Sequence, residues 1–176
     1  QTCALPIYLT DECVDVISRL VVGKLIALGV EYIRMNQTKV ASLCKALQHS
    51  SCKLTILSLQ NIDFFAAGVD PLCEALQHPS CKLTTLTMRG RSTINDVVVD
   101  SLCEALQHPS CKLTTLNLQE GSIVDINVAR LCEALQHPSC KLTTLSLQDF
   151  SINDTGVCIL FEGLQYPSCK LTTLNL

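Results

Sequence analysis

The chain has 176 residues, a formal charge of −3 at pH 7, no tryptophan and 4% aromatic residues. This length is typical of one domain, and the scarcity of aromatic residues predicts a core of aliphatic side chains. The sequence holds no run of lysines and arginines, which argues against nucleic-acid binding. Its longest apolar stretch is too short to cross a membrane, and its start lacks the basic and apolar segments of a secretory signal.

The first seven residues, Gln1–Ile7, have the sequence QTCALPI and fit no repeat. They look like one reading frame of a sequencing adapter, so we expect a non-native scar and exclude them from the reasoning about the fold. The sequence also begins without Met and stops within a predicted strand. We therefore expect it to be a fragment.

After a helical piece predicted for residues 8–24, the sequence repeats one phrase. LCEALQHPSCKLTTL begins at Leu72, Leu102 and Leu131, and looser copies begin at Leu43 and Leu160. The copies are 29 or 30 residues apart, a period typical of stacked leucine-rich units. We expect one repeat domain over residues 8–176. It divides into a partial unit at 8–24, units at 25–53, 54–82, 83–112, 113–141 and 142–170, and a partial strand at 171–176.

Each unit predicts a strand followed by a helix. The segment KLTTLNL alternates apolar and polar residues, as a half-buried strand does. The second half places apolar residues three and four apart, for example Val99, Leu102 and Leu106, which predicts an amphipathic helix. Asp70 and Pro71 suit a helix N-cap and the first helical residue. We expect the helices to end before the prolines that follow them: Pro79, Pro109, Pro138 and Pro167.

A constant order of strand and helix predicts parallel strands joined by right-handed crossovers. Adjacent strands lie about 4.8 Å apart, whereas packed helices need about 8–10 Å, so stacked units must curve. The sequence therefore predicts an α/β leucine-rich-repeat solenoid in the form of a horseshoe. Its parallel strands would form the concave face and its helices the convex face.

The phrases LCEALQHPSCKLTTLNLQ and INDTGVCILFEGL closely resemble the ribonuclease-inhibitor-type leucine-rich repeats of NLR proteins. These proteins are cytosolic, NACHT-containing innate immune receptors, and the resemblance covers residues 8–176. It implies a ligand-sensing or autoinhibitory repeat domain, with a NACHT domain upstream. Ribonuclease inhibitor has similar repeats, so a stand-alone protein that binds and inhibits an enzyme is the alternative.

The chain departs from these repeats in two ways. The HPxCKL phrase usually marks alternate units, but here it or a close variant (HSSCKL, YPSCKL) marks every unit. The turn position three residues after the last strand leucine, commonly Asn or Cys, holds Ile62, Arg91, Gly121 and Phe150 here. A buried polar ladder after the strands is therefore in doubt, and looser turns are expected.

The twelve cysteines invite a disulfide or metal interpretation. Cys3 apart, most fall in two columns, and within a unit they are eight residues apart, unlike C-x-x-C zinc or redox pairs. We expect buried free thiols, which behave as small hydrophobes and indicate a reducing, cytoplasmic location. One column is predicted in the helices and the other before the strands: Cys44, Cys73, Cys103, Cys132; and Cys52, Cys81, Cys111, Cys140, Cys169.

Other polar residues also form columns. The histidines lie too far apart to share a metal, and we expect their imidazoles to meet the negative ends of the helix dipoles. The lysines and glutamates are expected to be solvated, with a weak anion-attracting edge as the alternative for the lysines. The three columns are His49, His78, His108 and His137; Lys24, Lys53, Lys82, Lys112, Lys141 and Lys170; and Glu74, Glu104, Glu133 and Glu162.

The sequence shows no Gly-rich phosphate loop, nucleophile elbow or pair of catalytic carboxylates. We therefore predict a non-catalytic interaction module without cofactor or metal. In a solenoid the binding surface is the one that the repeats create. The candidate residues lie between the strand leucines on the concave face, where Arg89 is the leading single contact: Glu31, Ile56, Ser58, Gln60, Thr85, Thr87, Arg89, Thr115, Asn117, Gln119, Thr144, Ser146 and Gln148.

The expected partner is a protein ligand or, through the resemblance, an intramolecular NACHT domain. Nucleic acid and membrane are not expected partners. Solenoids need polar caps at both ends, and none is evident in this sequence. We therefore expect the isolated chain to self-associate through its uncapped ends, as an effect of truncation.

Overall fold

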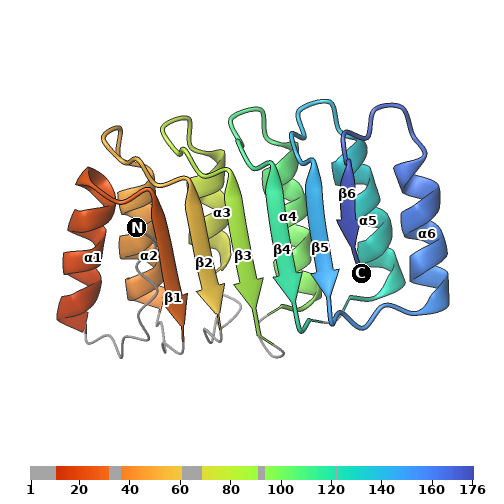
Figure 1. The fold of residues 1–176 in the computed structure, drawn as a ribbon, viewed down its shortest axis with the longest axis horizontal. Coiled ribbons are helices and arrows are strands. Elements are labelled where there is room, and N and C mark those ends of the chain that lie inside the picture. The colour runs from red at the N-terminus through yellow and green to blue at the C-terminus, as the bar shows by residue number, and fades with distance from the viewer. Residues whose placement is uncertain (1–10, 32–36, 61–68, 91–93, 122) are drawn as a thin grey trace.

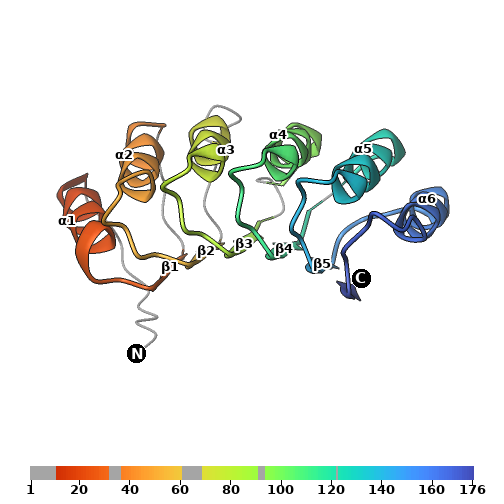
Figure 2. The ribbon, with the colours of Figure 1, turned by 90° about the horizontal axis from the view of Figure 1, so that it is seen from above.

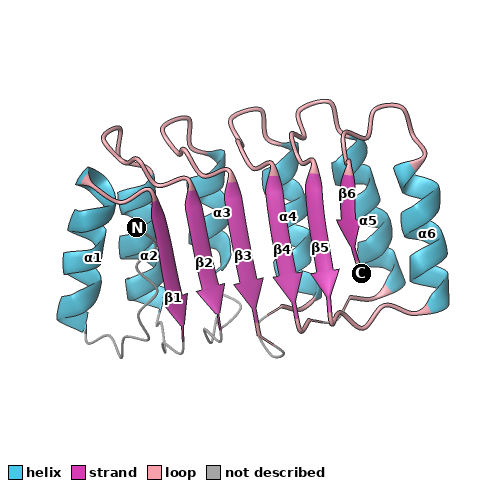
Figure 3. Ribbon diagram, in the orientation of Figure 1, coloured by secondary structure: helices cyan, strands magenta, loops and turns pink. Residues whose placement is uncertain are grey.

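The computed structural model describes residues 11–31, 37–60, 69–90, 94–121 and 123–176. In this part of the chain six helices alternate with six strands (Figure 1, Figure 3). The predicted scar, Gln1–Ile7, lies outside the described residues. The helices are α1 (Asp11–Gly23), α2 (Gln37–Leu47), α3 (Val69–Gln77), α4 (Asp96–Gln107), α5 (Asp125–Gln136) and α6 (Asp154–Leu164). The strands are β1 (Ala27–Glu31), β2 (Ile56–Gln60), β3 (Thr85–Arg89), β4 (Thr115–Gln119), β5 (Thr144–Gln148) and β6 (Thr173–Asn175).

The six strands form one sheet in chain order, and neighbouring strands are parallel. The register pairs equivalent positions of successive units, so that Leu86 faces Leu116 and Leu116 faces Leu145. All three leucine side chains are fully buried. The predictions of parallel strands and of a buried leucine column are confirmed.

The helices cover one face of the sheet and leave the other face open (Figure 2). Seen from above, the helix layer and the strand layer follow a shallow arc with the helices on its outer side (Figure 2). Each helix packs against the next helix along the chain. The architecture is thus a solenoid-like α/β stack of repeated strand–helix units. None of the helices in the described ranges combines the length and the apolar character that spanning a membrane requires.

The core lies between the two layers and is aliphatic. In α4 the predicted face of Val99, Leu102 and Leu106 is buried, and the small side chains of Cys103 and Ala105 are buried beside it. The helices approach closely at such small residues. A Cβ atom added to Gly163 of α6 would lie 2.6 Å from the sulfur of Cys132 in α5. The close approach explains why Gly163, like Ala105 at the equivalent position of α4, is a small residue.

The helix starts differ from prediction. Asp70 is not the N-cap of α3, because the helix already begins at Val69 and includes both Asp70 and Pro71 in its first turn. The first-turn N–H groups have no partner inside the helix, so a proline there sacrifices no hydrogen bond. The prediction made Pro71 the first helical residue, whereas it is the third residue of α3.

Asparagines cap two of the other helices. The Oδ1 atom of Asn95 accepts a hydrogen bond from the backbone N–H of Val98 at 3.2 Å, and that of Asn153 accepts from Gly156 at 2.7 Å. Val124 holds the same position before α5 and provides no side-chain bond. The helix ends agree with the predictions: α4 stops at Gln107, and His108, which precedes Pro109, has the extended backbone that a residue before proline prefers.

Gly121 and Phe150 hold the turn position after β4 and β5, where the repeats that the sequence resembles commonly have Asn or Cys. Phe150 lies against Gly121, because a Cβ atom added to Gly121 would clash with the phenylalanine ring. The preceding residues Glu120 and Asp149 have left-handed backbones, with φ of 58° and 56°. An aromatic ring on a glycine therefore fills the place of the Asn or Cys ladder. Ile62 and Arg91, the other two turn positions, lie outside the described residues.

Candidate functional site

The open face of the sheet carries the predicted binding residues. The ladder brings them together as three columns, each formed by one alternate position of the strands. Most of these side chains are half-buried, whereas Ile56 and Gln148 are exposed. The columns, which we call the open face, are Ile56, Thr85, Thr115 and Thr144; Ser58, Thr87, Asn117 and Ser146; and Glu31, Gln60, Arg89, Gln119 and Gln148.

Side-chain hydrogen bonds link neighbours on the open face, one between strands β3 and β4 and one within β2. The amide Nδ2 of Asn117 donates to the hydroxyl of Thr87 at 3.2 Å, and Nε2 of Gln60 donates to the hydroxyl of Ser58 at 3.3 Å. Ser146 is a correction to the predicted surface, because only 6% of it is exposed. Its register partners are Asn117 and Asn175, whose longer side chains flank the short serine. The centre of the face is therefore uncharged.

The open face holds two charged side chains, Glu31 and Arg89, and Arg89 forms an ion pair with Glu120, the residue after β4. The Nη2 atom of Arg89 lies 2.7 Å from Oε1 of Glu120, and its Nε atom donates to the same oxygen at 3.1 Å. The side chains of the pair are 43% and 23% exposed. Arg89, the leading single contact predicted for this face, is thus held by a carboxylate while its side chain stays partly exposed. Glu120 was missed by sequence reasoning because it follows the last strand position and belongs to a left-handed turn.

The lysine column is not merely solvated. The ammonium of Lys112 donates to the carbonyls of Pro79 and Cys81, both at 2.8 Å, in the turn of the preceding unit. Lys141 and Lys170 repeat this arrangement one and two units later, and Lys82 donates to the carbonyl of Ser50 at 3.3 Å. We call these contacts the lysine clamps. They engage four of the six ammonium groups that the anion-attracting alternative required.

The histidine column has a structural role of a different kind from the one expected. The Nδ1 atom of His78 accepts the backbone N–H of Ser80 at 3.2 Å, and its carbonyl accepts the N–H of Cys81 at 3.0 Å. His49, His108 and His137 make the same bonds. An accepting Nδ1 carries no proton, so each ring closes the turn after its helix as a neutral acceptor. The residue two positions after each of these histidines is a serine, and this repeated spacing could have indicated the turn from the sequence.

The described cysteines are free thiols, and eight are buried: Cys44, Cys52, Cys73, Cys81, Cys103, Cys111, Cys132 and Cys140. Burial raises the pKa of Cys44 and of Cys103 to about 12, and that of Cys132 to about 11. Thiols of this kind are poor nucleophiles, because the thiolate is the reactive form. The prediction of buried, unpaired cysteines is confirmed for these eight. Cys169 is half-buried and Cys158 is exposed.

The open face offers hydroxyls, amides and one ion pair, which suit the binding of another polar surface. Across the described ranges, no group of three or more His, Cys, Asp or Glu side chains could hold a metal ion. No protein-family model matches the chain, and no curated protein matches its sequence.

Proposed function

We propose that the chain is a non-catalytic protein-interaction module. Its repeats would continue into a horseshoe with the open face as the concave surface. The observation that carries the proposal is the in-register sheet, which aligns the outward-facing side chains of successive strands in three columns that are polar from β3 to β5. Such a continuous ladder without helices above it provides an extended surface for one large partner.

The repeat phrases support a narrower form of the proposal, a fragment of the ligand-sensing or autoinhibitory domain of a cytosolic NLR-like innate immune receptor. The partner would then be a protein ligand or the NACHT domain of the same polypeptide. The buried free thiols support a reducing, cytoplasmic location, because disulfides form and persist mainly in oxidising compartments.

The full-length open reading frame provides the first test. We expect a NACHT domain upstream of these repeats. A reading frame that encodes repeats alone would contradict the receptor proposal and favour a stand-alone inhibitor resembling ribonuclease inhibitor.

A second test locates the contact. Asn117→Arg, at the centre of the open face, should weaken binding of the separately expressed NACHT domain by about tenfold or more, because it places a long charge against the partner. Val97→Arg is the matched control, since Val97 lies in α4 on the helix side and is 53% exposed. Equal effects of the two substitutions would contradict the assignment of the open face as the contact.

A further inference from the structure

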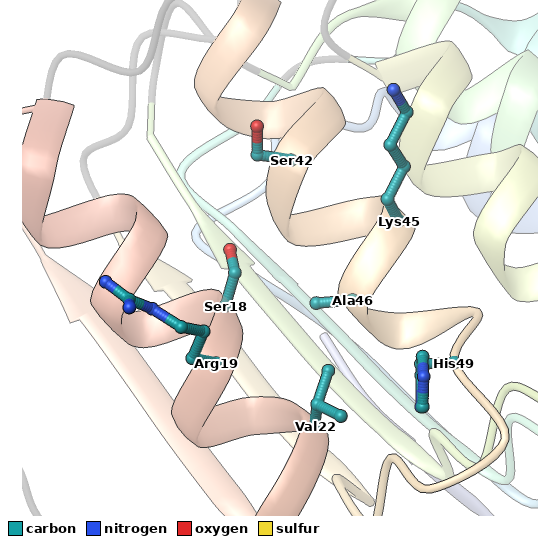
Figure 4. A pocket seen from close by; sticks show the side chains of 7 residues that line it. All are labelled: Ser18, Arg19, Val22, Ser42, Lys45, Ala46 and His49. Atoms are coloured by element: carbon teal, nitrogen blue, oxygen red, sulfur yellow. The ribbon is translucent and has the colours of Figure 1, made fainter.

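A groove of about 420 Å³ lies between α1 and α2, on the helix side of the molecule and away from the open face (Figure 4). Its volume is within the range of small-molecule sites in proteins. Seven residues line it: Ser18, Arg19, Val22, Ser42, Lys45, Ala46 and His49. Ser18, Val22 and Ala46 lie in the gap between the two helices, and Arg19 and Lys45 flank it (Figure 4).

The groove exists because α1 departs from the other helices. Helix α1 runs to Gly23, two residues before Leu25, whereas α5 ends at Gln136, six residues before Leu142. The histidine–serine turn is therefore missing from this unit. Matching Val21 with Leu47 as the last buried helical residue places Ser18 where α2 has Cys44. A smaller, polar side chain thus stands in the position of the packing cysteine.

Ser18 also has an unmet hydrogen-bonding group. Its Oγ atom is buried, and no atom of the described residues pairs with it. Native structures rarely leave a buried hydroxyl without a protein, water or ligand partner. The groove therefore has a buried hydroxyl group, that of Ser18, beside the apolar side chains of Val22 and Ala46.

The charged groups at the groove are all hydrogen-bond donors. Arg19 and Lys45 are exposed, and no carboxylate is among the lining residues. The Nδ1 atom of His49 accepts the N–H of Ser51 at 3.1 Å, which leaves its Nε2 as the protonated, donating nitrogen. The Nε atom of Arg19 donates to the backbone carbonyl of Asp15 at 3.3 Å, at the long end of hydrogen-bond distances.

The surrounding sequence has the same sign. Residues 1–60 hold six basic residues against four acidic ones, Asp11, Glu12, Asp15 and Glu31, a formal charge of +2. Residues 61–176 hold seven basic residues against twelve acidic ones, a formal charge of −5. The groove thus lies in the basic third of an acidic protein, where the field favours negative ligands.

We propose that the groove between α1 and α2 binds a small molecule that carries an oxyanion, a phosphate or a carboxylate, on an apolar body. The oxyanion accepts hydrogen bonds from Ser18, and the exposed side chains of Arg19 and Lys45 turn inward to it about their own bonds. The apolar body covers Val22 and Ala46. This site is independent of the open face and of the proposed partner protein.

Phenyl phosphate, benzoate and inorganic phosphate are suitable probes, with benzyl alcohol as the neutral counterpart. Titration of ¹⁵N-labelled protein should shift the amide signals of Ser18, Ala46 and His49, and the two aromatic anions should bind at least about tenfold more tightly than benzyl alcohol. Comparison of phenyl phosphate with benzoate separates a phosphate ligand from a carboxylate ligand. Absence of shifts at these residues would overturn the proposal and leave water as the partner of Ser18.

Charge-removing variants make the test specific. The double variant Arg19→Gln and Lys45→Gln should bind phenyl phosphate at least about tenfold more weakly, because two charged donors are lost. Lys53→Gln removes one charge from the same third of the chain without touching the groove, and it should leave the affinity nearly unchanged. Equal losses in Lys53→Gln and Lys45→Gln would show a diffuse charge effect and overturn the site.

The serine is tested separately from folding. Ser18→Ala should weaken binding severalfold while the protein stays folded, as monitored by thermal unfolding, because alanine suits a buried helix position. Undiminished affinity in a folded Ser18→Ala protein would contradict the role assigned to the hydroxyl.

Discussion

Asn95, Val124 and Asn153 occupy the same position before three successive helices, yet only the asparagines cap their helix. The backbone of Val124 is extended, as a capping residue requires, and its side chain is 50% exposed. The position thus has the geometry of an N-cap but lacks the side-chain oxygen. Single residues of this kind, rather than the repeat itself, set differences in stability between units.

Val124→Asn should supply the missing acceptor and raise the free energy of unfolding by about 1 kcal/mol. The reverse change, Asn95→Val, should lower it by a similar amount, because the N–H of Val98 loses its partner. Urea unfolding followed by circular dichroism measures both. A midpoint that does not rise for Val124→Asn would mean that the start of α5 is fixed by other contacts.

The buried thiols predict a dependence of stability on pH. Burial raises the pKa of Cys44 and of Cys103 to about 12. A thiol in the unfolded chain ionises near pH 8.5. The folded protein therefore binds more protons above this pH, so stability is fully present below about pH 8.5 and falls as pH rises toward the folded pKa. Each such thiol contributes a slope of about 1.4 kcal/mol per pH unit in this window.

Urea unfolding at pH 7.5, 9 and 10 checks this prediction. Cys103→Ala should reduce the slope of stability against pH, and Cys158→Ala is the matched control because Cys158 is exposed. Identical slopes for Cys103→Ala and the unchanged protein would contradict the assignment to buried thiols.

At the scale of elements, the lysine clamps join each turn to the unit that follows it. Lys141 donates to the carbonyls of Pro109 and Cys111 at 2.8 and 2.7 Å, and its partners lie 32 and 30 residues upstream. These bonds supplement the strand ladder with a contact at the point where each helix ends and the next strand begins. A helix end and a strand start are thereby held in a fixed relation across the unit boundary.

Lys141→Met should lower the free energy of unfolding by about 1–2 kcal/mol, because two charge-assisted hydrogen bonds are lost while the aliphatic stem is kept. Lys53→Met is the control, since no carbonyl of the described residues is shown bonded to Lys53. Comparable losses in both variants, measured by urea unfolding, would mean that the clamps contribute nothing beyond the packing of the stem.

Much of this element structure could be predicted from the sequence, because burial imposes a period. The alternating leucines that include Leu86, Leu116 and Leu145 fix strands, register and the open face without further information. The lysine clamps could not be predicted in this way, since backbone carbonyls are present at every residue and carry no sequence signal. Glu120 was missed for a related reason, because its pairing with Arg89 depends on a left-handed turn outside the strand pattern.

At the scale of the whole molecule, the described stack exposes apolar side chains at both of its ends. At the far end from α1, β6 pairs with β5, Leu174 is half-buried and Leu176 is 53% exposed. At the near end Ile26 is 62% exposed beside β1. Both ends thus present apolar side chains together with a strand edge, a combination that recruits other chains.

The 176-residue polypeptide should therefore self-associate at micromolar concentration, which sedimentation velocity or sizing with light scattering measures. Adding a polar capping repeat at each end should return it to a monomer, because the caps cover the strand edges. A capped chain that remains oligomeric would show that the association uses another surface.

The lysine clamps also affect the order in which the units are completed during synthesis. The carbonyls of Pro79 and Cys81 belong to one unit, but the ammonium that satisfies them, on Lys112, lies more than thirty residues later. During synthesis on the ribosome, the clamped carbonyls of a turn therefore have no lysine partner until the following unit has emerged. We therefore expect the hydrogen bonds of the clamps to form in order from the N-terminal side, each one about one repeat after its turn has been synthesised.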